Sequence, residues 1–61
     1  MLTGKELKIK RVILDIKATD IANALGVHRS YISNMEKGIR EIPKRRYTQW
    51  VSYLNEKEGS M

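Results

Sequence analysis

The chain contains no cysteine and only one histidine, one proline and one tryptophan among its 61 residues. Without cysteine, neither a disulfide nor a thiolate metal site can stabilise the fold. A single histidine also excludes a metal site built from histidines alone. A chain this short buries a modest core. We therefore expect one domain held by compact packing, to which self-association could add.

Long apolar runs are missing as well. The longest run is Val12–Leu14, which is far too short to cross a bilayer. The first residues, MLTGKE, lack the apolar stretch of a secretory signal. We expect a cytoplasmic protein without a membrane partner, and the lack of cysteine fits a reducing compartment.

The residue groups on which most enzymes depend are not recognisable either. The sequence has no obvious carboxylate pair, no nucleophile–base set and no glycine-rich phosphate loop. About 60 residues also leave little room for a substrate pocket. We expect no enzymatic activity, no cofactor, no metal and no small-molecule ligand.

Positive charge is abundant by contrast. Twelve lysines and arginines against seven acidic residues give a net charge of +5. A small basic domain favours a polyanionic partner, although charge alone does not separate DNA from RNA or a membrane surface.

The spacing of apolar and capping residues predicts helices throughout. Thr3 and Glu6 form a capping-box pattern at the start of a first helix over residues 4–14, with Leu2 and Leu7 spaced as its hydrophobic staple. A second helix over residues 19–25 ends at a glycine suited to the left-handed C-terminal position, Gly26. A third helix covers residues 29–37, and another glycine ends it.

Pro43 suits the first position of a fourth helix, where its missing N–H costs nothing. The fourth helix carries a core-facing stripe at helical spacing, formed by Tyr47, Trp50, Val51 and Leu54. The fold class is therefore all-α, a compact bundle of four to five short helices in one domain over residues 3–54. Residues 55–61 are predicted to form a short polar C-terminal tail that frays.

The second and third predicted helices have the layout of a helix-turn-helix. Ala22 is a small residue where the two helices would touch, Gly26 stands at the bend, and Ile32 and Met35 form an apolar underside of the following helix. The outer face of that helix is polar and can hydrogen-bond to base edges and phosphates. Its members are His28, Arg29, Ser30, Ser33 and Asn34.

Residues 21–38 read IANALGVHRSYISNMEKG. This stretch resembles the Cro/cI-type helix-turn-helix pattern of the XRE family of phage and bacterial transcription regulators, Leu-Ala-x-x-x-Gly-Val-Ser-x-x-x-Ile-Ser-x-x-Glu-x-Gly. The resemblance covers about residues 3 to 54. It implies a dimer that inserts the third helix of each copy into successive major grooves, with half-sites about 34 Å apart.

Within this motif we predict base contacts from Arg29, Ser30, Asn34 and Ser33. An arginine can form two hydrogen bonds with guanine and an asparagine two with adenine. The alternative is that these residues form a solvated helix face without contacts to DNA. This alternative is strongest for Ser33, which is predicted to lie further round the helix.

The residues that follow the third helix are basic. Five cations and one carboxylate give residues 37–46 a net charge of +4. We predict phosphate contacts from these residues and from the start of the third helix. Consecutive residues of a helix point in different directions, so residues 44, 45 and 46 cannot all contact DNA. The residues concerned are Lys37, Arg40, Lys44, Arg45, Arg46 and His28.

The resemblance also places Arg11 where the family has a first-helix arginine that pairs with the glutamate matching Glu36. We predict a structural ion pair rather than a catalytic one. Its loss would lower the melting temperature.

Three positions depart from the family pattern. His28 replaces the usual Ser or Thr cap of the recognition helix, so either Ser30 helps or the helix start is looser. Ala18 stands where the family often has glutamine, and Lys17 occupies the preceding cap position. These departures leave the target sequence open.

The roles of some aromatic and apolar residues also stay open. Tyr31 could pack on the fourth helix or direct its hydroxyl to a phosphate. Tyr53 lies off the core stripe, and with Ile9 and Ile13 it is a candidate dimer or partner surface.

The sequence thus predicts a sequence-specific regulator that binds double-stranded DNA as a homodimer. We expect a repressor from a bacterium, a phage or a mobile element. The alternative is a protein-interaction module of the same fold, such as an antitoxin or anti-activator. That alternative predicts apolar residues on the recognition face.

Overall fold

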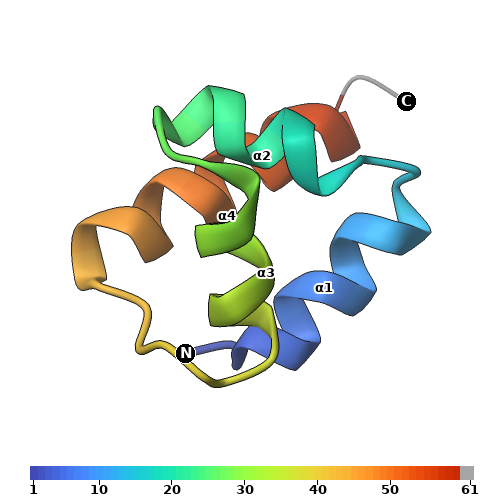
Figure 1. Cartoon of the computed structure of the whole chain (residues 1–61). Helices are drawn as coiled ribbons and strands as arrows, with labels where there is room; N and C mark the ends of the chain where they lie inside the picture. Colours follow the sequence, from blue (N-terminus) through green and yellow to red (C-terminus); the bar gives the residue numbers. More distant parts are fainter. Residues whose placement is uncertain (60–61) are drawn as a thin grey trace.

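The computed structural model describes residues 1–59, whose regular secondary structure consists of helices joined by short turns and loops (Figure 1). The helices are α1 Gly4–Ile13, α2 Ala18–Leu25, α3 Arg29–Glu36 and α4 Lys44–Gly59. No strand occurs within these 59 residues. The predicted all-α bundle is confirmed, with four helices.

The start of α1 is fixed by the predicted capping box. The Thr3 hydroxyl accepts a hydrogen bond from the Glu6 amide at 3.2 Å, and Glu6 Oε1 accepts one from the Thr3 amide at 2.9 Å. Because these bonds favour the charged carboxylate, chiefly the bond from the Thr3 amide, the pKa of Glu6 lies below its ordinary value.

The connection from α1 to α2 differs from a simple linker. Asp15 adopts φ 58° in the left-handed region, which a short polar side chain tolerates better than most. The turn places Ile16 in the core. The sequence pattern missed this residue because its helical spacing ends with α1.

The turn between α2 and α3 is the helix-turn-helix bend. Gly26 has φ 71°, a conformation that glycine adopts at little steric cost. The amide of the half-buried Val27 donates to the Ala22 carbonyl at 3.0 Å and closes the end of α2. Gly38 ends α3 in the same way, with φ 79°, so both predicted glycine stops are confirmed.

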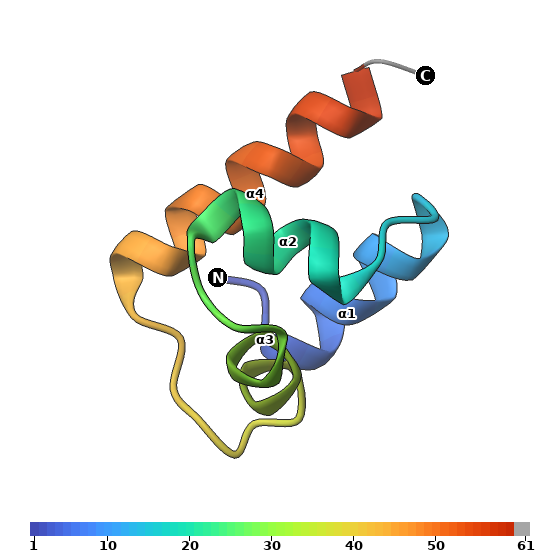
Figure 2. The same ribbon diagram turned by 45° about the horizontal axis from the view of Figure 1, so that its top comes forward.

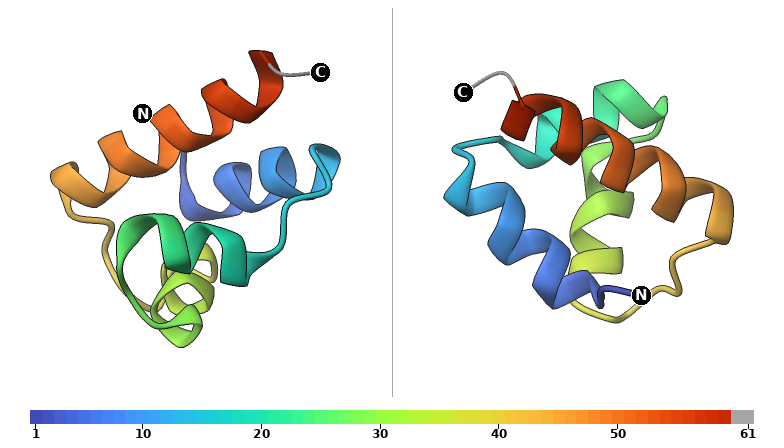
Figure 3. Two further views of the ribbon diagram at one scale, coloured as in Figure 1. Left: turned by 90° about the horizontal axis from the view of Figure 1, so that it is seen from above. Right: turned by 180° about the vertical axis from the view of Figure 1, so that it is seen from behind.

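All four helices contribute to one core. Leu7, Ile21, Ile32 and Trp50, one from each helix, have no exposed surface. Figure 2 shows α3 almost end-on beneath α2 and α4, and Figure 3 shows α4 running along one side of the bundle. The predicted core role of Trp50 is confirmed. Tyr47 and Val51 of the predicted stripe are partly buried against this core.

Both ends of α4 differ from the prediction. Pro43 stands at the N-cap position, just before the first helical residue, and not at the first helical position itself. Its carbonyl accepts a hydrogen bond from the Tyr47 amide at 2.9 Å. At the other end α4 continues to Gly59, beyond the predicted domain limit at residue 54.

Two side-chain contacts support this extension of α4. The Lys57 ammonium lies 5.3 Å from the centre of the Tyr53 ring, and Glu58 forms an ion pair with Lys10 of α1 at 3.6 Å. The tail predicted for residues 55–61 is therefore helical as far as Gly59. Residues 60 and 61 lie outside the described residues.

Candidate nucleic-acid interface

The outer side of α3 collects the residues predicted to contact bases. Ile32 and Met35 point into the core, whereas Arg29 and Ser30 are exposed and Ser33 and Asn34 are half-buried. Arg29, Ser30, Ser33 and Asn34 line one shallow hollow together with Lys37 and Ala18. Ser33 therefore shares a surface with the other three, although its spacing predicts a place further round the helix. We call these six residues the α3 hollow.

Ala18 contributes the opposite wall of the α3 hollow. It is the first residue of α2. Its side chain is partly buried against the core and lines the hollow beside the residues of α3.

His28 acts as the N-cap of α3. Its Nδ1 accepts a hydrogen bond from the Ser30 amide at 3.1 Å. The ring itself caps the helix, which answers the question left open by the missing Ser or Thr. Because an accepting ring nitrogen carries no proton, the proton of the neutral imidazole lies on Nε2, which is then a donor.

The basic residues after α3 divide into two groups. Lys37, Lys44 and Arg45 are exposed. Arg40 is also exposed and holds its guanidinium 5.4 Å from the centre of the Tyr31 ring. Tyr31 packs partly buried against the core, so it supports Arg40 from below.

Arg46 belongs to the second group because it is engaged within the protein. Its Nη1 donates to the Leu25 carbonyl at 2.7 Å and to Gln49 Oε1 at 3.3 Å. The first bond ties α4 to the C-terminal end of α2, next to the bend. A positioning role therefore competes with the phosphate contact predicted for this residue.

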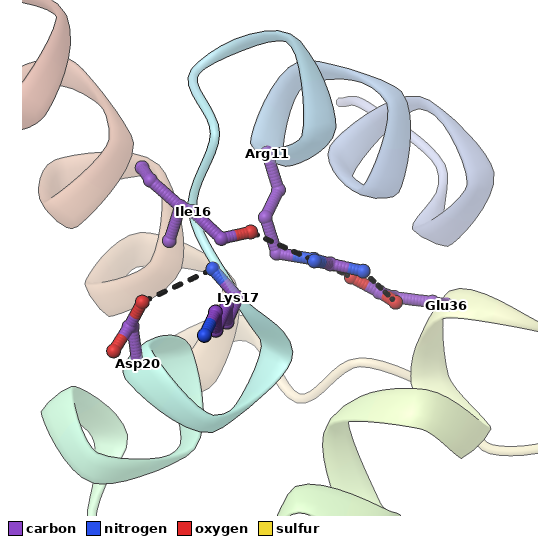
Figure 4. Close-up of polar contacts among 5 residues, drawn as sticks. All are labelled: Arg11, Ile16, Lys17, Asp20 and Glu36. Carbon is purple, nitrogen blue, oxygen red and sulfur yellow. Dashed lines mark hydrogen bonds and ion pairs between the residues drawn. The ribbon is translucent and has the colours of Figure 1, made fainter.

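Arg11 and Glu36 form a paired, largely buried contact (Figure 4). Arg11 Nε donates to Glu36 Oε2 at 2.8 Å and Arg11 Nη2 donates to Oε1 at 3.0 Å. Arg11 Nη1 donates to the Ile16 carbonyl at 2.8 Å. The two side chains are 11% and 4% exposed. This network joins α1, the α1–α2 turn and the end of α3.

Gly4 positions the same end of α3, and the sequence pattern did not single it out. A Cβ at Gly4 would overlap the Met35 carbonyl oxygen and stand 3.0 Å from Glu36 Cα. Only glycine lets the start of α1 approach the α3 backbone this closely. In Figure 1 the first turn of α1 lies beside the last turn of α3.

No group of three or more His, Cys, Asp or Glu residues in the described part of the chain could hold a metal ion. None of the helices within residues 1–59 is both long enough and apolar enough to cross a membrane.

Comparison with known protein families gives one match. The model of the family HTH_3, described as helix-turn-helix, matches residues 7–59. Neither the curated proteins nor the solved structures contain a significant match.

Proposed function

The chain belongs to the XRE family of DNA-binding helix-turn-helix proteins, and on this premise we propose that it is a sequence-specific transcriptional repressor. In this proposal two copies bind a pseudo-palindromic operator on double-stranded DNA. Each copy inserts α3 into the major groove, with half-sites about 34 Å apart. Repression follows from occupancy of DNA that overlaps a promoter.

The observation that carries the proposal is the α3 hollow. It gathers one guanidinium, one amide and two hydroxyl groups on a single face of an eight-residue helix. Arg29 can donate two hydrogen bonds to guanine and Asn34 can pair with adenine. Each good bidentate contact discriminates by about 1–3 kcal/mol. The face is polar, which favours DNA over the protein partner of the alternative function.

Phosphate contacts would surround this reading face. We assign them to Lys37, Arg40, Lys44 and Arg45, whose charges are exposed. Arg46 is left out because its guanidinium is bonded to the Leu25 carbonyl. These contacts would supply affinity that is independent of base sequence and falls with salt.

His28 and the start of α4 would add neutral donors. With Nδ1 occupied by the Ser30 amide, Nε2–H of His28 can donate to a phosphate oxygen without protonation of the ring. Pro43 offers no side-chain acceptor at the start of α4, so the first amides of that helix are free to face a phosphate.

Selection of bound sequences from random duplex DNA tests the proposal. We expect a pseudo-palindromic site in which each half contains the bases read by one α3. If no sequence is enriched, specific recognition is excluded. A single unpaired half-site would exclude the dimer.

Two substitutions on the selected site separate reading from phosphate binding. Asn34→Ala should relax preference at one position per half-site. Arg45→Ala should weaken binding to all sequences alike and reduce the salt slope by about 0.9 for each lost phosphate contact. Lys57→Ala removes a cation near the far end of α4 and should change neither. Equal behaviour of the Asn34 and Arg45 variants would contradict the division of roles.

The direction of regulation needs a separate measurement. A reporter promoter that overlaps the selected site should lose expression when the chain is produced. An increase in expression would show an activator instead.

A further inference from the structure

Helix α1 is apolar on its outer side as well as its inner side. Ile9, Val12 and Ile13 are 51%, 58% and 74% exposed. They follow the buried Leu7 by two, five and six residues, which places them about 200°, 140° and 240° round the helix from it. Their centre is thus nearly opposite the core. A helix that is apolar on both sides normally packs on both sides.

These three side chains form a continuous surface. With Lys5 and Lys8 they line one shallow hollow, and Ile9 and Ile13 continue into a second hollow beside it. The apolar residues are spaced at i, i+3 and i+4, which is the spacing that receives the side chains of another helix. We call Lys5, Lys8, Ile9, Val12 and Ile13 the α1 outer face.

The unpaired charge at the α1 outer face is positive. Neither Lys5 nor Lys8 has an ion-pair partner in the described part of the chain, and both are exposed. The nearest carboxylate on α1, Glu6, is held by the capping box, while Lys10 is paired with Glu58. Asp15 lies beyond the C-terminal end of the helix, a full helix length from Lys5.

We propose that the α1 outer face binds an acidic amphipathic helix of another protein. The partner would lay leucine-like side chains over Ile9, Val12 and Ile13 and place carboxylates against Lys5 and Lys8. A second copy of this chain fits less well. Its own α1 outer face would bring two more unpaired lysines and no free carboxylate to pair with Lys5 and Lys8. The α1 outer face and the α3 hollow share no residue. Protein and DNA partners could therefore be bound together.

The test uses the full chain, labelled with 15N, and three synthetic 18-residue helical peptides. The first carries a leucine stripe flanked by glutamates, the second has lysines in place of the glutamates, and the third has alanines in place of the leucines. We expect the first peptide alone to bind saturably and to shift the amide resonances of α1. The third peptide measures attraction by charge alone, including attraction to the DNA-binding surface.

A double variant, I9S with I13S, should weaken the first peptide by roughly tenfold or more, because the largest apolar contacts are lost. I39S is the matched control, since Ile39 is 70% exposed but lies outside α1. Both variants should keep the helical spectrum and the DNA affinity of the unmodified chain. A failure of DNA recognition would thus be distinct from a failure at this face.

Several results would overturn the proposal. One is the absence of binding by the leucine–glutamate peptide, and another is equal binding by the leucine–lysine peptide. Unchanged binding by the double variant would also contradict it. Analytical sedimentation of the unmodified chain and of the double variant measures their oligomeric state. If the unmodified chain is a dimer and the double variant a monomer, the face belongs to a second copy of the chain.

Discussion

At the scale of single residues, the Arg11 guanidinium makes the densest set of polar contacts in the described chain. Three of its nitrogens donate within the protein, two to Glu36 and one to the Ile16 carbonyl. Because the Glu36 side chain is only 4% exposed, neither charge is well solvated. The pair is thus sensitive to removal of either partner.

Glu36→Ala should therefore lower the free energy of unfolding by about 3 kcal/mol, since Arg11 would be left buried without its counter-charge. Denaturant unfolding measures the change. Glu41→Ala, in the exposed loop after α3, should have little effect. Equal stability of the Glu36 variant and the unmodified chain would show that the pair contributes nothing to folding.

Gly4→Ala should also destabilise the fold, by about 1–3 kcal/mol, because the added methyl group overlaps the backbone of α3 at Met35. Gly59→Ala is the matched control, since nothing lies within 4 Å of a Cβ there. Melting temperatures of the two variants distinguish the cases. If both changed alike, close packing of α1 on α3 would not be the cause.

At the scale of helices, the start of α1 couples stability to pH. The lowered pKa of Glu6 means that the folded state favours its carboxylate. The stability that Glu6 contributes is complete above its ordinary pKa of 4.5 and is lost as the pH falls through the lowered value. Acid thus weakens the first turn.

Glu6→Gln should make unfolding less dependent on pH in this acidic range, because glutamine keeps a hydrogen-bond acceptor without a titrating charge. Urea unfolding from neutral pH down to below pH 4.5 measures the dependence. Glu41→Gln removes a carboxylate that caps no helix and serves as the control. An unchanged pH profile in the Glu6 variant would exclude this coupling.

Helix limits were predictable where their cause is local. The capping box of Thr3 and the two left-handed glycines act within a few residues, and the helices end where these signals stand. Contacts between distant segments were not predictable in this way. Ile16 enters the core through a turn at Asp15, and Arg46 reaches the end of α2. Neither contact has a signature in residue spacing.

In the candidate site, too, local features were predictable from the sequence and contacts between distant segments were not. The polar side of α3 follows from helical periodicity, so its residues could be named from the sequence. Periodicity could not show that Ser33 shares the hollow with Ala18, or that a histidine ring caps α3. Those facts depend on the bend angle and on a side-chain rotamer. On α1, the sequence indicated Ile9 and Ile13 as a candidate surface, but it did not indicate that the exposed Val12 belongs to it.

At the scale of the whole molecule, one core serves all four helices. Its centre includes Trp50, the only tryptophan of the chain, which has no exposed surface. Within residues 1–59, the buried apolar residues form this one cluster. Removal of any one helix would therefore expose core side chains of the other three to solvent.

We predict that the chain unfolds in a single transition. Trp50 fluorescence and far-ultraviolet circular dichroism should give the same midpoint in urea, because one reports the core and the other the helices. Midpoints that differ beyond error would reveal a helix that melts separately. The extended end of α4 is the first place to look, since residues 55–59 are exposed.

The four polar side chains that α3 contributes to the α3 hollow are not used to hold the fold together. Within residues 1–59, no hydrogen bond or ion pair joins the side chains of Arg29, Ser30, Ser33 or Asn34 to the rest of the chain. Substitutions at these four positions thus carry little folding cost. After gene duplication, one copy can diverge there and acquire a different target while the bundle beneath it stays the same.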